Sequence, residues 1–118
     1  MRVLGIDPSL RSTGFGIVEE TNGALSPVAY GIIKPTAKLP LHLKLAEIKN
    51  ELETLIRTHG PAEAAVENPF YAQNMKTALL LGQVRGAVLV AVAGTGCDLA
   101  EYSALEIKKA VTGYGQAD

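Results

Sequence analysis

The 118-residue chain contains a single cysteine and shows no excess of charge. One cysteine, Cys97, permits no disulfide within the chain and no metal site built from several cysteines. We expect it to be a small buried thiol. Eleven Lys and Arg residues stand against twelve Asp and Glu residues, so the net charge does not indicate a basic nucleic-acid-binding protein. The net charge leaves open whether one face is basic.

Long hydrophobic runs are also absent from the sequence. The start of the chain is apolar only over residues 3–6, and the longest run, residues 86–94, is too short to cross a membrane. Apolar residues make up 47% and charged residues 19%, which is typical of a globular domain and excludes a disordered chain. We therefore expect one cytoplasmic domain over residues 1–118, with no membrane segment.

The spacing of apolar residues predicts an α/β fold. Strands are expected over residues 2–7, 14–19, 25–34, 62–67 and 98–102. Helices are expected over residues 41–58, 75–93 and 104–113. Asn22-Gly23 favours a tight hairpin between the second and third strands. This order predicts a mixed five-stranded sheet, an antiparallel meander plus parallel strands, flanked by helices.

Two acidic residues end predicted strands in the same way. Asp7 and Glu67 each follow a short apolar strand, and each is followed within two residues by a proline. If the two strands are parallel neighbours, the carboxylates meet at one edge of the sheet, where a hard cation such as Mg²⁺ or Mn²⁺ would relieve their repulsion. The alternatives are ordinary: Asp7 as a turn former, and Glu67 bonding to the N–H groups of the turn that follows it.

Five short segments in the same order resemble the RuvC-type Holliday junction resolvases. They are Gly5-Ile6-Asp7-Pro8-Ser9 with Thr13-Gly14-Phe15-Gly16, Val66-Glu67-Asn68-Pro69-Phe70, Leu81-Gly82-Gln83-Val84-Arg85-Gly86, Glu101-Tyr102-Ser103-Ala104, and Ile107-Lys108-Lys109-Ala110-Val111-Thr112-Gly113-Tyr114-Gly115. The resemblance runs from Val3 to Asp118. It implies a ribonuclease H-like fold and a homodimer that cuts two opposing strands of a four-way DNA junction with divalent metal, two Mg²⁺ or Mn²⁺ ions in the complete protein. It also implies a junction-migration helicase complex as a partner.

The resemblance assigns roles to individual residues. Asp7 and Glu67 would be the metal-binding catalytic acids, and Phe70 would stack on a base exposed at the junction; its alternative is a core position. Lys108 and Lys109 would contact DNA phosphates, although cations near a helix C-terminus are favoured by the helix dipole in any protein. The helix through Gly82 and Gly86 would lie at or near the dimer interface, and close packing within the chain explains these glycines equally well.

The end of the sequence departs from this family. The family's last two acids lie on a C-terminal helix in an acid-x-x-acid pattern, and nothing after Gly113 matches it. We therefore expect a nuclease domain that lacks its C-terminal helix, with an incomplete metal site. The acids that remain as replacements are Glu63, Asp98, Glu101 and Asp118.

Three other functions remain as alternatives. The strand–Asp–turn–strand opening also resembles the phosphate-binding loop of sugar kinases and actin-like ATPases, which need a second domain. A ribonuclease H-like nuclease of the pre-ribosomal RNA resolvase kind begins with a similar Gly-x-Asp. The third alternative is a module that binds branched DNA or dimerises without cutting it.

Overall fold

The five expected strands form one sheet in the computed structural model, which describes residues 1–67 and 74–100. Their order across the sheet is β3-β2-β1-β4-β5. The strands are β1 (Arg2–Asp7), β2 (Thr13–Thr21), β3 (Ala24–Ile33), β4 (Glu63–Val66) and β5 (Asp98–Leu99). The two helices of the described residues are α1 (Leu41–His59) and α2 (Met75–Gly94). The helix expected from residue 104 lies outside the described residues.

The sheet is mixed, as the sequence predicts. Strands β1, β2 and β3 pair in antiparallel fashion, whereas β4 is parallel to β1 and β5 is parallel to β4. The turn between β2 and β3 places Asn22 at φ 54° and Gly23 at φ 84°. Two consecutive positive φ values are what a tight hairpin turn requires, so the Asn-Gly prediction is confirmed.

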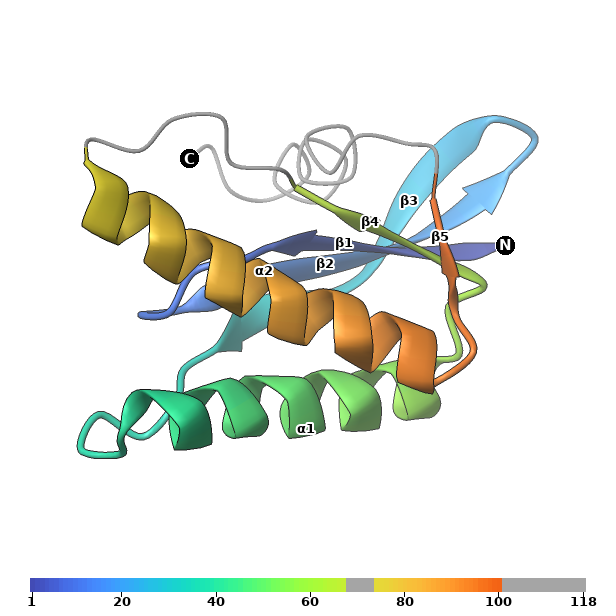
Figure 1. The fold of residues 1–118 in the computed structure, drawn as a ribbon. Coiled ribbons are helices and arrows are strands. Elements are labelled where there is room, and N and C mark those ends of the chain that lie inside the picture. The colour runs from blue at the N-terminus through green and yellow to red at the C-terminus, as the bar shows by residue number, and fades with distance from the viewer. Residues whose placement is uncertain (68–73, 101–118) are drawn as a thin grey trace.

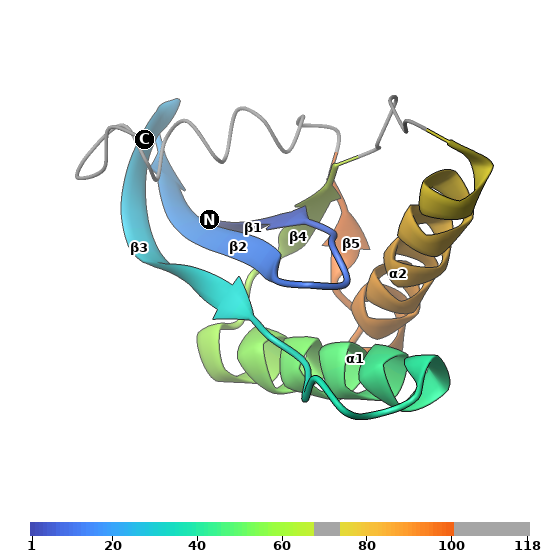
Figure 2. The same ribbon diagram turned by 90° about the vertical axis from the view of Figure 1, so that its left-hand side faces the viewer.

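Both helices cover the same face of the sheet (Figures 1 and 2). Helix α1 ends at Gly60, whose φ of 60° lets its N–H donate to the carbonyl oxygen of Ile56 at 2.8 Å. Helix α2 begins at Asn74, whose side-chain oxygen accepts a hydrogen bond from the N–H of Thr77 at 2.9 Å. Local signals therefore set the ends of these helices where the structure has them.

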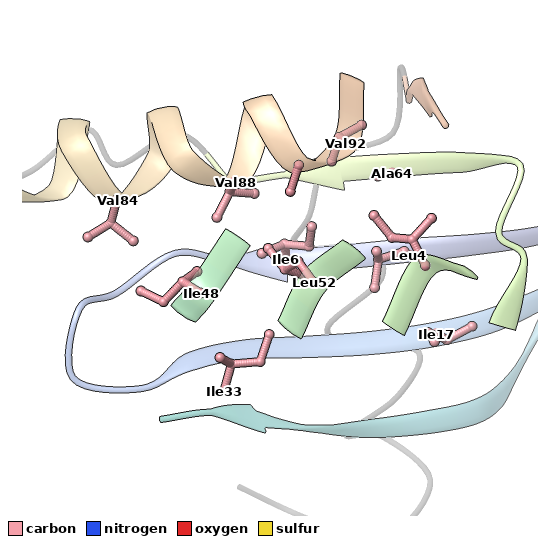
Figure 3. Close-up of a cluster of buried hydrophobic side chains, with 12 residues drawn as sticks. Leu4, Ile6, Ile17, Ile33, Ile48, Leu52, Ala64, Val84, Val88 and Val92 are labelled. Atoms are coloured by element: carbon pink, nitrogen blue, oxygen red, sulfur yellow. The ribbon is translucent and has the colours of Figure 1, made fainter. Parts of the chain in front are cut away.

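The core lies between this face of the sheet and the two helices (Figure 3). Leu4 and Ile6 of β1 meet Leu52 of α1 and Val88 of α2 there, and each of these side chains is at most 1% exposed. Alternate residues of the same strands point to the other face, where Val3 belongs to a smaller buried cluster. Strand β1 is thus buried on both faces, and its position is firmly fixed.

Helix α2 differs from the expectation about membrane-spanning length. At 20 residues it is long and apolar enough to cross a membrane by length and composition alone, although its longest uninterrupted apolar run is short. In this structure its buried side chains, among them Val84 and Val88, belong to the core shared with the sheet and α1. Length and composition do not separate such a core helix from a membrane span.

Candidate active site

Asp7 and Glu67 lie side by side at one edge of the sheet. Asp7 is the last residue of β1, and Glu67 follows the last residue of β4. The parallel ladder pairs Ile6 with Val66, and the N–H of Glu67 donates to the carbonyl oxygen of Ile6 at 2.9 Å. Both acidic residues are half-buried. The two strand ends that carry these acids are therefore neighbours, as the expected meeting of the carboxylates requires.

The turn after Asp7 is held by a buried hydroxyl group. Thr13 is fully buried, its Oγ1 donates to the carbonyl oxygen of Ser9 at 2.6 Å, and it accepts from the N–H of Ser9 at 3.1 Å. A side chain that both donates and accepts across a four-residue span fixes the connection between β1 and β2. This bracing role was not predicted; a threonine that follows the Asp-Pro-Ser turn is its only signal in the sequence.

Arg85 supports the end of β4 from helix α2. Its Nε donates to the carbonyl oxygen of Glu67 at 3.3 Å. Within the described residues Arg85 thus bonds to the main chain of one of the two acids. The interaction ties the backbone at Glu67 to a helix that is anchored in the core, so it restricts where that carboxylate can lie.

The paired carboxylates suit part of a divalent-cation site. Carboxylate oxygens are the ligands that Mg²⁺ and Mn²⁺ prefer, and two acids on adjoining strand ends place such oxygens together. Across residues 1–67 and 74–100, no group of three or more His, Cys, Asp and Glu side chains is placed to hold a metal ion. Among the described residues, two neighbouring acids are thus the largest such set at this place.

Glu63 and Asp98 do not complete this site. In the strand register, Glu63 at the start of β4 lies opposite Asp98 at the start of β5. On its other side, Glu63 lies opposite Val3, near the start of β1. Four residues of strand separate Glu63 from Glu67, which is about 13 Å at about 3.3 Å per residue. The suggestion that either acid replaces a missing ligand is therefore wrong. Glu101 and Asp118, the other two candidates, lie outside the described residues.

Gly82 and Gly86 lie on a side of α2 that does not contact the rest of the described chain. A Cβ atom built at either glycine would meet nothing within 4 Å. Close packing within the described chain therefore does not explain them. The same side carries three exposed apolar side chains at helical spacing, Met75, Leu79 and Val90, which are 87%, 66% and 55% exposed. We call these five residues the α2 stripe; it faces away from the core-facing side of the helix.

The three residues predicted to contact DNA have no described position. Phe70, Lys108 and Lys109 all lie outside the described residues.

Cys97 lies away from the paired acids, at the beginning of β5. It is half-buried rather than fully buried and packs against the edge of the core. Burial raises the pKa of the Cys97 thiol, and the nearby Asp98 and Glu63 carboxylates raise it further. A thiol held in its neutral form is a poor nucleophile. Cys97 therefore has the environment of a packing residue and not of a reactive thiol.

Comparison with known sequences gives one consistent result. The family model described as "Crossover junction endodeoxyribonuclease RuvC" matches residues 3–118. A protein of that name from Paraburkholderia phytofirmans is 48% identical over 117 residues, covering 99% of this chain and 64% of its own length. Another, from Brevibacillus brevis, is 42% identical over 118 residues and is covered to 71%. The chain thus spans a little under two thirds of the length of several of the curated relatives it matches.

Solved structures give the same fold. The structure of T. thermophilus RuvC in complex with a Holliday junction substrate superposes with a TM-score of 0.79 at 27% identity, covering 100% of this chain and 72% of that one. A second structure of Thermus thermophilus RuvC gives a TM-score of 0.75 at 30% identity, covering 100% and 73%. The predicted ribonuclease H-like sheet, an antiparallel meander extended by parallel strands, is confirmed by these matches.

Proposed function

Because this chain belongs to the crossover junction endodeoxyribonuclease RuvC family, we propose that it is the catalytic part of an enzyme that cuts four-way DNA junctions in recombination and repair. The products would be paired, symmetric nicks made by hydrolysis of phosphodiester bonds. The observation that carries the proposal is the pair of carboxylates, Asp7 and Glu67, on adjacent parallel strand ends. A site for cation-dependent phosphodiester hydrolysis needs such a pair.

In this mechanism Asp7 and Glu67 would hold divalent cations, Mg²⁺ or Mn²⁺, and the complete protein would hold two such ions. When bound, such ions neutralise the charge that develops on the attacking and leaving oxygens. The protein's own part is geometric. The buried Thr13 hydroxyl holds the turn after Asp7, and Arg85 holds the carbonyl group of Glu67, so the main chain that carries each acid is braced.

The remaining roles follow the family resemblance. Phe70 would stack on a base exposed at the junction, and Lys108 and Lys109 would bind phosphates. We place residues 1–118 in one ribonuclease H-like nuclease domain, cytoplasmic in location, and the resemblance assigns the last two acidic ligands to a C-terminal helix. A junction-migration helicase complex is the expected partner.

A homodimer through the α2 stripe matches the symmetry of the substrate. One site cuts one strand, and resolving a junction requires two cuts related by a two-fold axis, which a C₂ dimer provides. The stripe supplies an exposed apolar surface with two glycines, where a second helix can approach closely.

The direct test is cleavage of a labelled four-way junction beside a linear duplex of the same sequence. We would use this chain and an extended protein, in which the chain is joined to the part of the Paraburkholderia phytofirmans relative that the match does not cover. The extended protein is expected to make paired nicks in opposing strands with Mg²⁺ or Mn²⁺, and none with EDTA. Cleavage that persists in EDTA, or that is equal on the linear duplex, would contradict the proposal.

The same cleavage test on the isolated 118-residue chain distinguishes two functions. Among its described residues, no three His, Cys, Asp or Glu side chains are placed to hold a metal ion. This favours a second candidate function for the isolated chain, a module that binds branched DNA or dimerises without cutting it. Metal-dependent nicking by the isolated chain would exclude this candidate. Junction binding without nicking would support it.

Phe70→Ala in the extended protein is expected to reduce junction cleavage and to leave metal binding intact. Loss of one stacked base removes about 1–3 kcal/mol, which corresponds to roughly a fivefold to 150-fold loss of rate if the stacking forms before cleavage. Mn²⁺ titration of the variant gives the metal affinity. Collapse of that affinity would place Phe70 in the core instead, and Phe70→Tyr, which keeps an aromatic ring, should retain most of the activity.

Gly82→Ala and Gly86→Ala are expected to affect the monomer and the dimer in opposite directions. In the interior of a helix, alanine is more stable than glycine by about 1 kcal/mol of free energy. Neither added Cβ would meet another atom of the described chain. The helix should therefore gain stability, while a dimer packed on the glycines should dissociate at higher protein concentration. Sedimentation equilibrium with thermal unfolding separates the two effects; an unchanged dimer affinity would place the interface elsewhere.

A further inference from the structure

A cavity lined by basic side chains begins at Ser9, two residues after Asp7 along the chain. Its volume is about 500 Å³, which is within the range of about 300–1,000 Å³ seen for ligand pockets. Four separate parts of the fold contribute to it: the β1–β2 connection, the segment after β3, the first turn of α1, and the first turns of α2. The β1–β2 connection and the beginnings of both helices lie at one end of the molecule (Figure 2).

Three cationic side chains line this cavity, and none of them is neutralised by the described chain. Arg11 lies on the β1–β2 connection, Lys34 follows β3, and Lys44 is in the first turn of α1. No carboxylate is among the described residues that line the cavity. The ion pairs of residues 1–67 and 74–100 involve other cations, namely the N-terminus, Arg2, Lys49 and Arg57. The three charges are therefore available to an external anion.

Apolar side chains line this cavity as well, and we call them its floor. Leu10, Leu80 and Leu81 line the same cavity, together with the hydroxyl-bearing residues Ser9 and Thr77. Apolar surroundings lower the local dielectric and strengthen the attraction between these cations and a bound anion. The N-terminal ends of α1 and α2 add positive potential. A small inorganic anion would leave the floor uncovered, whereas a sugar-phosphate unit would cover it with the sugar.

Two of the walls are held firmly in place. The Ser9 wall is fixed by its paired hydrogen bonds to Thr13. The wall that contains Lys34 is tied to α1 through Thr36, whose N–H and hydroxyl donate to the two carboxylate oxygens of Glu47 at 2.8 and 3.0 Å. A site whose walls are fixed before binding loses little entropy when the ligand arrives.

We propose that this basic cavity binds the sugar-phosphate backbone of DNA, on the strand that passes the paired acids. Ser9 lies two residues after Asp7, so the β1–β2 connection joins the cavity to the strand end that carries Asp7. The substrate rests on the proposed function; the anion chemistry rests on Arg11, Lys34 and Lys44. The cavity thus fixes the direction of one DNA arm without reading its sequence.

The test is the salt dependence of DNA binding by the 118-residue chain. Arg11→Gln/Lys34→Gln removes two exposed cations from the cavity. Lys49→Gln/Arg57→Gln is the matched control. It makes the same change in net charge, but on α1 at residues that do not line the cavity. Fluorescence anisotropy with a four-way junction, a linear duplex and inorganic phosphate as competitor would be measured across a series of KCl concentrations.

The cavity variant is expected to bind both DNA forms on the order of tenfold more weakly, with the slope of log K against log salt reduced by about 0.9 for each phosphate that the variant no longer neutralises. The control should keep the wild-type slope. Equal slopes for the two variants, or no DNA binding by the wild-type chain, would overturn the proposal. The proposal would also be overturned if millimolar phosphate bound in the cavity while the variant left DNA binding unchanged. That result would mark a site for small anions.

The proposed function and the proposed DNA-binding role of the cavity can be contradicted independently of each other. A wild-type protein that binds duplex as tightly as junction, and never cuts either, would contradict the junction nuclease. The difference in slope between the cavity variant and its control would still hold in that case, because phosphate binding does not depend on junction structure.

Discussion

Asp7→Asn and Glu67→Gln are each expected to abolish junction cleavage by the extended protein while leaving junction binding in place. Either substitution removes a negative charge and one ligand oxygen from the only pair of acids that the described structure brings together at this edge of the sheet. A loss of about 4 kcal/mol of transition-state stabilisation corresponds to about a thousandfold loss of rate. Single-turnover cleavage and anisotropy binding, both with Mg²⁺, measure the two properties.

The chain supplies matched controls for this experiment. Glu63→Gln and Asp98→Asn make the same chemical changes at the other end of β4 and on β5. These variants should cleave at close to the wild-type rate, because their carboxylates lie about 13 Å along the strand from the active edge. Cleavage retained by Asp7→Asn or Glu67→Gln would remove the catalytic assignment. Equal losses in all four variants would show a general effect on folding or charge instead.

Leu52→Ala is expected to produce the largest loss of stability. Leu52 is fully buried between α1, α2 and the sheet. Removing its terminal atoms loses the transfer free energy and leaves a cavity, at a cost of about 2–5 kcal/mol. For a domain of this size each kcal/mol lowers Tm by about 4–8 °C, so we expect a decrease of at least about 8 °C in a thermal unfolding experiment.

Leu43→Ala is the control for this substitution. It removes the same atoms from the same helix, but Leu43 is 42% exposed. Its cost should stay near about 0.5 kcal/mol, the usual limit for a surface position. A similar decrease in Tm for both variants would mean that α1 does not pack against the sheet through the side that carries Leu52.

Most of the fold was predictable because its signals are local. The Asn22-Gly23 turn, the end of α1 at Gly60 and the apolar period of α1 each depend on residues close together in the chain, and each is confirmed. The parallel pairing of β1 with β4 was the condition for the two acids to meet, and the structure fulfils it.

The properties that sequence reasoning missed or left open depend on residues far apart in the chain. Arg85 contacts the backbone of Glu67 across 18 residues, and no spacing rule distinguishes that partner from an acid or a phosphate. The suggestion that Glu63 or Asp98 replaces a missing ligand failed for the same reason. A strand has two ends, and only the pairing register decides which end each acid occupies.

The sequence by itself determined the order of elements, the two acids at strand ends and the resemblance to a family, because these depend on short-range preferences and short motifs. Only the tertiary structure decided what those residues meet. It brought Asp7 beside Glu67 and left Gly82 and Gly86 open on the outer side of α2. It also gathered Arg11, Lys34 and Lys44 around one cavity, since a cavity exists only where separate elements pack together.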